Sequence, residues 1–184
     1  KNEFLKICDI LDKLEIRYFL QTGILLGAIR DNGFIPWDWD VEISVYSKEV
    51  IEKINHLVDE IKKSDFKIEK YNKELSDLKI DFKGKLPKET THYSILGWSH
   101  DKTKKIFWRN KFKVPEHLFI NMYKIKLFDR YHFAPWPPED YLKYHYGNWQ
   151  KPLRSCNKSQ YLTKEYYDVP IIKNFIKKII SAIF

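Results

Sequence analysis

The fold is decided by a short acidic stretch that reads Trp37-Asp38-Trp39-Asp40-Val41-Glu42-Ile43-Ser44-Val45. Alternate side chains of a β-strand point to opposite sides of the sheet. The stretch therefore predicts a strand with two different faces. One face is acidic and carries Asp38, Asp40 and Glu42, and the other is apolar and packs on a core.

The three carboxylates predict a metal site. Alternate residues of a strand lie only about 6.6 Å apart, so three negative charges on one face repel each other. A divalent cation removes this cost, since Mg²⁺ binds one or two carboxylates together with substrate phosphates. Asp40 and Glu42 have a suitable spacing, and Asp81, between Ile80 and Phe82, is the best candidate for a further ligand from a neighbouring strand. The alternative is an edge strand with a solvated acidic face, and the alternation alone favours it.

The residues before the acidic stretch change this balance. Gly23 and Gly27 flank a short predicted helix that follows a predicted strand, and Arg30 comes directly after them. Glycines allow backbone N–H donors to approach a phosphate, and the forked guanidinium of arginine suits the same ligand. Glycines in an ordinary turn and an arginine on the surface are the alternative. Their place immediately before the acidic stretch favours a substrate-binding site.

The rest of the chain predicts helices that alternate with strands. We expect helices at 4–14, 24–30, 48–62 and 139–146, the last ended by Gly147, and strands at 16–20, 37–45, 66–71, 78–82, 93–98 and 105–108. This order favours an α+β fold with a mixed β-sheet flanked by helices and a C-terminal part rich in helix and aromatic residues.

Length and composition indicate a single globular domain over residues 1–184. The net charge of +8 points to an anionic partner. Lysines are scattered and lack the arginine and aromatic clusters of an RNA-binding surface, so we expect no nucleic acid. Aromatic residues make up 16% of the chain, which allows some to line a groove, although core packing is the simpler interpretation.

The cysteines and the C-terminal segment bear on location. Cys8 and Cys156 lie far apart and form no zinc-binding motif, which suits the reducing cytoplasm. Residues 171–184 predict an amphipathic helix with isoleucines opposite lysines. We expect this helix to pack on the domain. The alternative is peripheral attachment to an anionic membrane, which places the protein at the inner face of that membrane.

Two adjacent runs, Thr22 to Arg30 and Asn32 to Glu42, closely resemble the LicD family, which also contains fukutin and fukutin-related protein. Further similarity at 78–82, 112–118 and 141–152 extends the resemblance over about residues 14–152. It implies a nucleotidyltransferase-like fold and the transfer of a phosphorylated alcohol, such as phosphocholine or ribitol phosphate, from a CDP-linked donor to a glycan or glycolipid.

The resemblance also assigns roles to individual residues. Asp38, Asp40 and Glu42 match the acidic motif of the family, Asp81 matches a later strand carboxylate, and Arg30 closes the glycine motif. The family more often has Asp at position 42. We expect Mg²⁺ or Mn²⁺ to be held by the four carboxylates.

In this scheme Arg30 and the segment around Gly23 and Gly27 hold the donor phosphates, and Asp81 is the first candidate for the base. Two alternatives stay open. One is a nucleotidyltransferase that moves a nucleoside monophosphate, and the other is a noncatalytic nucleotide- or glycan-binding module.

Overall fold

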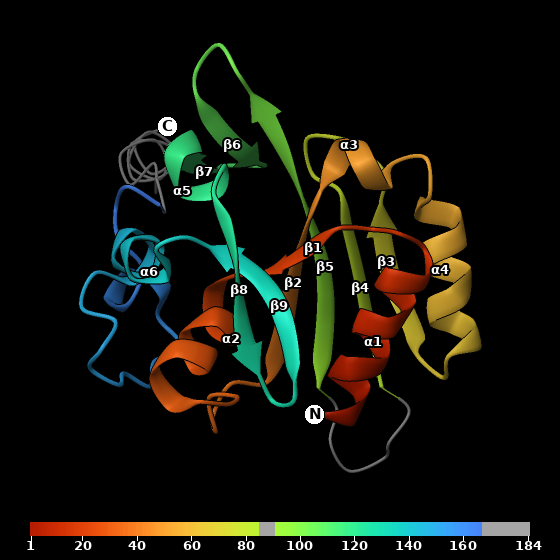
Figure 1. Ribbon diagram of the computed structural model, residues 1–184, viewed down its shortest axis with the longest axis horizontal. Coiled ribbons are helices and arrows are strands. Elements are labelled where there is room, and N and C mark those ends of the chain that lie inside the picture. Colours follow the sequence, from red (N-terminus) through yellow and green to blue (C-terminus); the bar gives the residue numbers. More distant parts are fainter. Residues whose placement is uncertain (85–90, 167–184) are drawn as a thin grey trace, which may run out of the picture.

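A mixed β-sheet forms the centre of the computed structural model, which describes residues 1–84 and 91–166 (Figure 1). Its strands follow the order β3-β4-β5-β2-β1-β9-β8. Their bounds are β1 (Tyr18–Leu20), β2 (Asp40–Tyr46), β3 (Lys67–Asn72), β4 (Lys79–Lys83), β5 (His92–Asp101), β8 (Met122–Leu127) and β9 (Arg130–Pro135). The β2–β5 and β1–β9 pairs are parallel, whereas the other neighbours in this order are antiparallel.

A smaller antiparallel extension continues from the end of β5. Strand β6 (Ile106–Arg109) pairs with residues 99–101 of β5, and β7 (Phe112–Pro115) pairs with β6. Because the strands of a sheet twist relative to each other, this extension turns away from the plane of the main sheet. Figure 1 shows it at the top of the molecule, above α5 (Glu116–Phe119).

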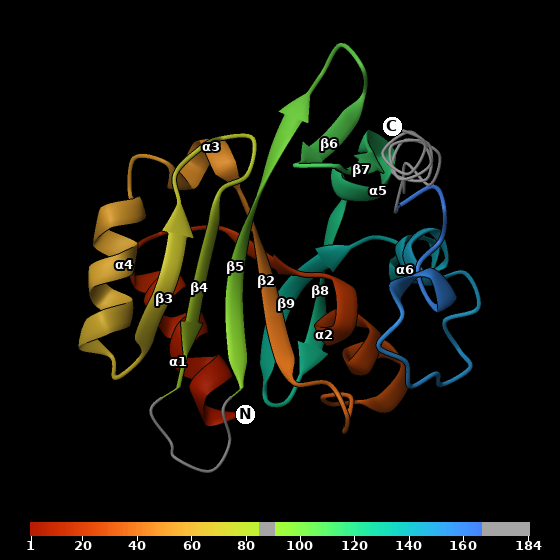
Figure 2. The same cartoon turned by 180° about the vertical axis from the view of Figure 1, so that it is seen from behind.

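The helices fall into two groups. Helices α1 (Asn2–Lys13) and α4 (Ile54–Lys63) pack on each other on one side of the sheet. Helix α2 (Thr22–Leu26), a π-helical turn (Gly27–Asp31) and α6 (Pro138–Tyr146) lie near β8 and β9. Seen from behind in Figure 2, none of the described helices lies in front of β3, β4 and β5. A short helix α3 (Ser47–Val50) and a 3₁₀ turn (Lys158–Gln160) complete the elements.

The apolar face of β2 packs into the core. Val41, Ile43 and Val45 are buried in one cluster with the apolar side chains of α1 and α4. Burial of this face contributes roughly 1.5–3 kcal/mol for each fully buried aliphatic side chain. It also fixes the register of β2, because a shift by one residue would bring the acidic side chains into the core. The polar side chains of β2 therefore lie on the opposite side of the sheet.

The predicted α+β fold with its mixed sheet and flanking helices is confirmed, and so is the end of α6 at Gly147, whose φ is 66°. The acidic strand begins at Asp40 and not at residue 37. Residues 35–38 form a turn instead, in which the amide of Asp38 donates to the carbonyl of Ile35 at 3.0 Å. Pro36 favours this turn because its ring fixes φ at the second position.

Two other expectations need correction. The helix predicted over 48–62 is interrupted at residues 51–53, where the amino group of Lys53 donates to the carbonyl of Leu14, one residue beyond the end of α1, at 2.8 Å. The sequence interpretation also did not find β7, β8, β9 and α5. The expected helix at 171–184 lies outside the described residues. In the part that the structure describes, no helix is both long enough and apolar enough to cross a membrane.

Candidate active site

Asp38, Asp40 and Glu42, called the acidic cluster below, lie together where the chain enters β2. Asp40 and Glu42 project from the polar face of the strand, and Asp38 precedes it. Although Asp38 is exposed at the surface, partial desolvation of its carboxyl group by the surrounding protein and the charges of Asp40 and Glu42 raise its pKa to about 7. Carboxylates that share a site hold protons more tightly in this way. The cluster therefore has an excess of negative charge that favours a cation.

The glycines of the preceding motif allow the acidic cluster to approach the helical segment. A Cβ at position 23 would collide with a carboxylate oxygen of Asp38, and a Cβ at position 27 would collide with the carbonyl oxygen of Gly33. The amide of Gly33 also donates to the carbonyl of Gly27 at 3.1 Å. Only glycine permits such a close approach without displacement of the neighbouring chain. Gly23 and Gly27 thus have a packing role here, and their role in phosphate binding stays a prediction.

Thr22 holds one member of the cluster in place. Its Oγ1 donates to Oε2 of Glu42 at 3.0 Å. Burial and the charge of Asp40 raise the pKa of Glu42, while the hydrogen bond from Thr22 lowers it. Thr22 has a φ of 51°, which is rare for a β-branched residue. Sequence reasoning did not assign a role to Thr22, although it begins the glycine motif.

Buried side chains of α6 contact the backbone of Thr22. The Tyr141 hydroxyl has the backbone of Thr22 as a hydrogen-bond partner and lies 3.2 Å from Nδ1 of His145. Burial lowers the pKa of His145 to about 3, so its ring stays neutral at ordinary pH. The conformation of Thr22 is therefore fixed by a neutral, buried network.

Four tyrosines, Tyr141, Tyr146, Tyr161 and Tyr166, lie within electrostatic range of Glu42 and are called the tyrosine layer below. Burial raises the pKa of each hydroxyl, and the nearby negative charge of Glu42 adds to the effect in all four. They come from α6 and from the segment that follows it. The sequence interpretation treated Tyr146 as packing and assigned nothing to the other three. Their spacing along the chain follows neither a helical nor a strand period, so periodicity could not identify them.

Asp81 shares a sheet face with Glu42 but lies further away. Ser94 of β5 pairs with Glu42 on one side and with Asp81 of β4 on the other. Two strand spacings separate the backbones of Glu42 and Asp81 by about 10 Å. Asp81 accepts a hydrogen bond from Ser94 Oγ at 2.6 Å and forms an ion pair with Lys79 at 2.9 Å. A direct partner thus already neutralises its charge.

Arg30 is also engaged with other protein groups. Its Nε and Nη2 donate to the two carboxylate oxygens of Asp31 at 2.9 and 2.7 Å, and its Nη1 donates to the carbonyl of Trp149 at 3.4 Å. The guanidinium accordingly lowers the pKa of Asp31. Its side chain is only 10% exposed. This arrangement joins the π-helical turn to the segment after α6.

Asp38 and Asp40 are the two carboxylates that best fit a divalent cation. Their oxygens are the ligands that Mg²⁺ and Mn²⁺ prefer, and two carboxylates with substrate phosphates form a common Mg²⁺ site. One carboxylate oxygen of Glu42 already accepts a hydrogen bond from Thr22, and Asp81 forms an ion pair with Lys79. Within residues 1–84 and 91–166, no three His, Cys, Asp or Glu side chains form a group that could hold a metal by themselves. Metal binding by this pair therefore stays a prediction, in which substrate oxygens supply the remaining ligands.

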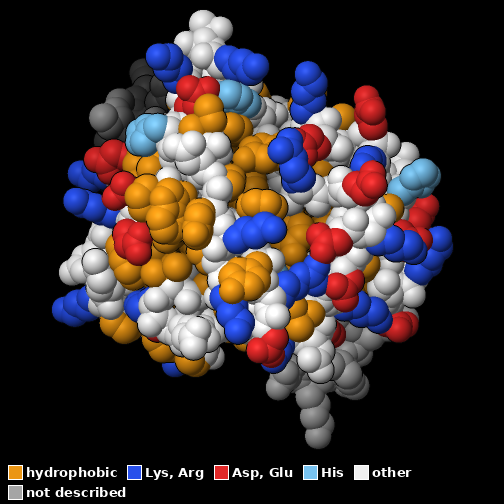
Figure 3. Space-filling view, in the orientation of Figure 1, with side chains coloured by type: hydrophobic (Ala, Val, Ile, Leu, Met, Phe, Trp, Pro, Cys, Tyr) orange, Lys and Arg blue, Asp and Glu red, His pale blue; other side chains and the backbone are white. Residues whose placement is uncertain are grey.

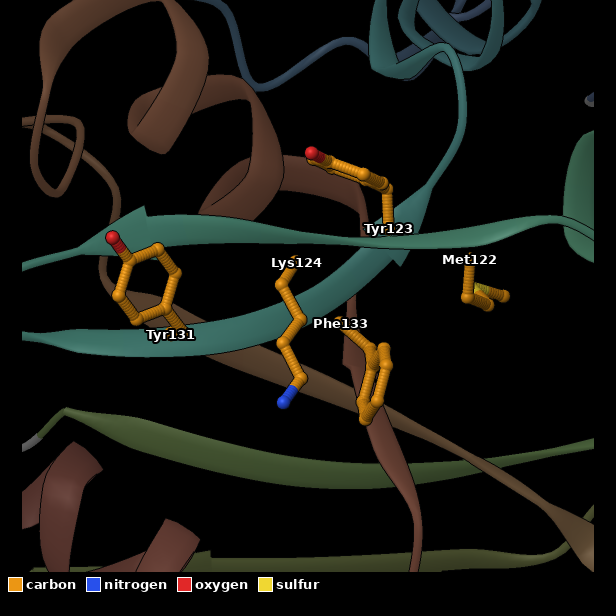
Figure 4. Close-up of a pocket in the computed structure, with 5 residues that line it drawn as sticks. All are labelled: Met122, Tyr123, Lys124, Tyr131 and Phe133. Carbon is orange, nitrogen blue, oxygen red and sulfur yellow. The ribbon is translucent and has the colours of Figure 1, made fainter.

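A separate hollow lies at the edge of the sheet on β8 and β9. Its volume is about 420 Å³, and it is lined by Met122, Tyr123, Lys124, Tyr131 and Phe133 (Figure 4). Tyr123 and Tyr131 are 57% and 65% exposed, and Figure 3 shows hydrophobic and basic side chains side by side on this face of the molecule. None of the predicted site residues lines the hollow. It is distinct from the acidic cluster.

Comparisons with known proteins agree with the predicted resemblance. A family profile described as LicD/FKTN/FKRP, nucleotidyltransferase domain, matches residues 15–136. The ribitol 5-phosphate transferase FKRP of Homo sapiens is 41% identical over 44 residues, which are 24% of this chain and 9% of that protein. The lipopolysaccharide cholinephosphotransferase LicD of Haemophilus influenzae is 42% identical over 40 residues, 22% of this chain and 15% of that protein.

An uncharacterized protein of Rickettsia typhi is 34% identical over a longer stretch of 65 residues, which are 35% of this chain and 20% of that protein. The alignments with these three relatives thus cover a fifth of their length or less.

Proposed function

Because the chain belongs to the LicD/FKTN/FKRP nucleotidyltransferase family, we propose that it is a metal-dependent transferase of a phosphorylated alcohol. The donor in this proposal is a CDP-linked alcohol, and the acceptor is a hydroxyl of a glycan or glycolipid. Two relatives, a ribitol 5-phosphate transferase and a cholinephosphotransferase, support a phosphorylated alcohol as the transferred group. The free thiols of Cys8 and Cys156 suit a reducing cytoplasm.

The observation that supports the proposal most directly is the acidic cluster. Desolvation of the Asp38 carboxyl group and the nearby charges of Asp40 and Glu42 together raise its pKa to about 7. Such an arrangement is costly for a purely structural surface and becomes favourable when a cation and phosphates bind. Active sites are where perturbed carboxylates of this kind gather. The proposal therefore rests on Asp38 and Asp40 as the metal-binding pair.

The residues around the pair have separate tasks in the proposed reaction. When bound, Mg²⁺ or Mn²⁺ supplies positive charge at the donor diphosphate. Thr22 orients the Glu42 carboxylate, and the tyrosine layer excludes water from one side of it. Glu42, with a pKa raised by burial, is the first candidate to accept the proton of the attacking hydroxyl. Asp81 is the second candidate, because Lys79 and Ser94 already occupy its oxygens.

A donor screen tests the proposal. CDP-choline, CDP-ribitol, CDP-glycerol and CDP-ethanolamine are each incubated with the protein, Mg²⁺ and a glycan mixture, and CMP release is measured. We expect Mg²⁺-dependent CMP from at least one donor and no CMP above background from Asp40→Asn with an unchanged circular dichroism spectrum. Pyrophosphate release from CTP, with no CMP from any CDP-alcohol, would instead identify a nucleoside monophosphate transferase.

A further inference from the structure

Arg109 has an unusual environment for an arginine. It ends β6 and is only 8% exposed. Its Nε lacks a hydrogen-bond partner among the described residues, and its Nη2 lies 3.5 Å from Oδ1 of Asp77. A buried cationic donor without a partner is costly, so such a group often indicates a ligand that completes it. Arg109 is therefore a candidate for anion binding.

Arg109 lies on the extension beyond the end of β5, five residues along that strand from Ser94, the partner of Glu42, and aromatic contacts connect it to the surroundings of the acidic cluster. Trp108 pairs with Ser99 of β5, the strand that runs beside β2. Arg109 also lies against Phe112, with its guanidinium 5.9 Å from the ring centre, and Phe112 stacks on Tyr166 at 5.3 Å. Tyr166 belongs to the tyrosine layer described above. A continuous set of contacts thus links Arg109 to the surroundings of Glu42.

The electrostatics of Glu42 agree with this position. Burial and the charge of Asp40 raise the pKa of Glu42, and the positive charges of Arg109 and Lys158 act in the opposite direction. Lys158 comes from the 3₁₀ turn after α6 and is exposed. Two positively charged side chains from distant parts of the chain therefore act electrostatically on the same carboxylate.

Arg30, by comparison, has little capacity left for a substrate. Three of its nitrogens already donate to Asp31 and to the carbonyl of Trp149. A phosphate would meet at Arg30 a guanidinium whose positive charge the neighbouring Asp31 carboxylate already neutralises. The guanidinium of Arg109 has an Nε donor still to be satisfied.

We propose that Arg109 and Lys158 bind the diphosphate of the nucleotide-linked donor beside the acidic cluster, and that Arg30 is a structural residue. This inference rests on the proposed function for the identity of the donor. The chemistry is that of a diphosphate ester, whose oxygens accept charge-assisted hydrogen bonds from a forked guanidinium and from a lysine. The acidic cluster would hold a cation that supplies further positive charge to the same diphosphate.

Titration calorimetry with Mg²⁺ and three probes, inorganic pyrophosphate, CDP and cytidine, tests this inference. In Arg109→Gln we expect affinity for pyrophosphate and CDP to fall by about tenfold to a hundredfold, the range of a lost charge-assisted hydrogen bond. Affinity for cytidine should not change. Lys158→Gln should weaken the same two probes by a smaller factor, because Lys158 is exposed and its charge is screened.

Two arginine variants provide the controls. Arg17→Gln removes the same charge from the residue before β1, where Arg17 pairs with Glu49, and should leave pyrophosphate affinity unchanged. Arg30→Gln should reduce thermal stability but keep pyrophosphate affinity within about twofold. If Arg109→Gln does not fold, Arg109→Lys replaces it, with an expected loss of at least about threefold, because lysine lacks the fork.

The inference and the proposed function can fail separately. Wild-type affinity for pyrophosphate in a folded Arg109 variant, or loss of that affinity in Arg30→Gln alone, overturns the inference. Failure of the wild-type protein to bind pyrophosphate also overturns it. Pyrophosphate binding that depends on Arg109, without CMP release from any CDP-alcohol, would leave the phosphate site intact and contradict only the proposed reaction.

Discussion

Thr22 donates a hydrogen bond to Glu42 across 3.0 Å while its own backbone is held in the left-handed region, with φ at 51°. A non-glycine residue in this region costs about 1–3 kcal/mol, and such strain gathers at functional sites. The buried pair of Tyr141 and His145 keeps Thr22 in this conformation. The buried side chains of α6 therefore influence, through Thr22, the orientation of the Glu42 carboxylate.

The first prediction concerns this hydrogen bond. Thr22→Val keeps the branched shape but removes the hydroxyl, so Glu42 loses the side-chain hydrogen bond that Thr22 donates to it. We expect transferase turnover to fall by about tenfold or more, consistent with about 1–3 kcal/mol for an unsatisfied buried group. Thr22→Ser, which retains the hydroxyl, should keep most of the activity. Equal turnover in both variants would show that Glu42 needs no orientation by Thr22.

The second prediction uses the close approach of Gly23 to Asp38. Gly23→Ala introduces a Cβ that collides with the Asp38 carboxylate, so this carboxylate must leave its present position. We expect Mn²⁺ affinity, measured by electron paramagnetic resonance, to drop by about tenfold or more because one of two carboxylate ligands is misplaced. Gly33→Ala is the matched control, since its Cβ would meet only the carbonyl oxygen of Asp31 at 4.0 Å. Similar Mn²⁺ affinity in the two variants contradicts the prediction.

The third prediction concerns pH and stability without metal. The folded protein holds the Asp38 proton up to a pKa of about 7, whereas an unfolded aspartate releases it near pH 3.9. Between these values the folded state binds more protons, so the Asp38 contribution to stability decreases as pH rises through this window. Urea unfolding of wild type and Asp38→Asn at pH 4.5 and 7.5 checks this.

The comparison between these two proteins isolates Asp38 from the histidines. Burial lowers the pKa of His145 to about 3, which makes stability change with pH in the opposite direction. Because both proteins contain His145, that contribution cancels. Asp38→Asn should gain stability relative to wild type at pH 7.5 and gain less at pH 4.5. An identical difference at both pH values would refute the raised pKa.

The fourth prediction separates Asp81 from the acidic cluster. Asp81 lies two strands from Glu42 and is paired with Lys79 at 2.9 Å. Asp81→Asn should therefore keep Mn²⁺ affinity within about twofold, while Asp40→Asn should lose it, since only a directly bound carboxylate contributes a metal–oxygen bond. Electron paramagnetic resonance of both variants under the same conditions measures this. A matching loss in Asp81→Asn would restore the ligand role that the sequence predicts for it.

The acidic stretch shows how far sequence reasoning extends. Alternation correctly predicted the polar and apolar faces of β2, because a buried strand face has a strict period of two. It could not predict the turn at Ile35 and Pro36, which takes Asp38 out of the strand. Alternation also cannot predict the sheet order that separates Asp81 from Glu42, because strand pairing depends on contacts between residues distant in the sequence.

The surroundings of the cluster were harder to predict for the same reason. Arg109 and Tyr166 approach Glu42 from segments more than sixty residues further along the chain. Arg30 illustrates the opposite case, because its motif was recognised but its partner, the carbonyl of Trp149, was not. Local pattern identifies residue types suited to a task, and only the fold decides which of them meet.

The bond between Arg30 and Trp149 spans 119 residues of sequence. A ribosome delivers the N-terminal part first, so the glycine motif and β2 emerge long before α6 and the segment behind it. The glycine motif and its surroundings are then completed only when the last third of the domain arrives. A nascent chain that lacks this segment therefore holds its acidic residues without the contacts that α6 and the residues after it supply.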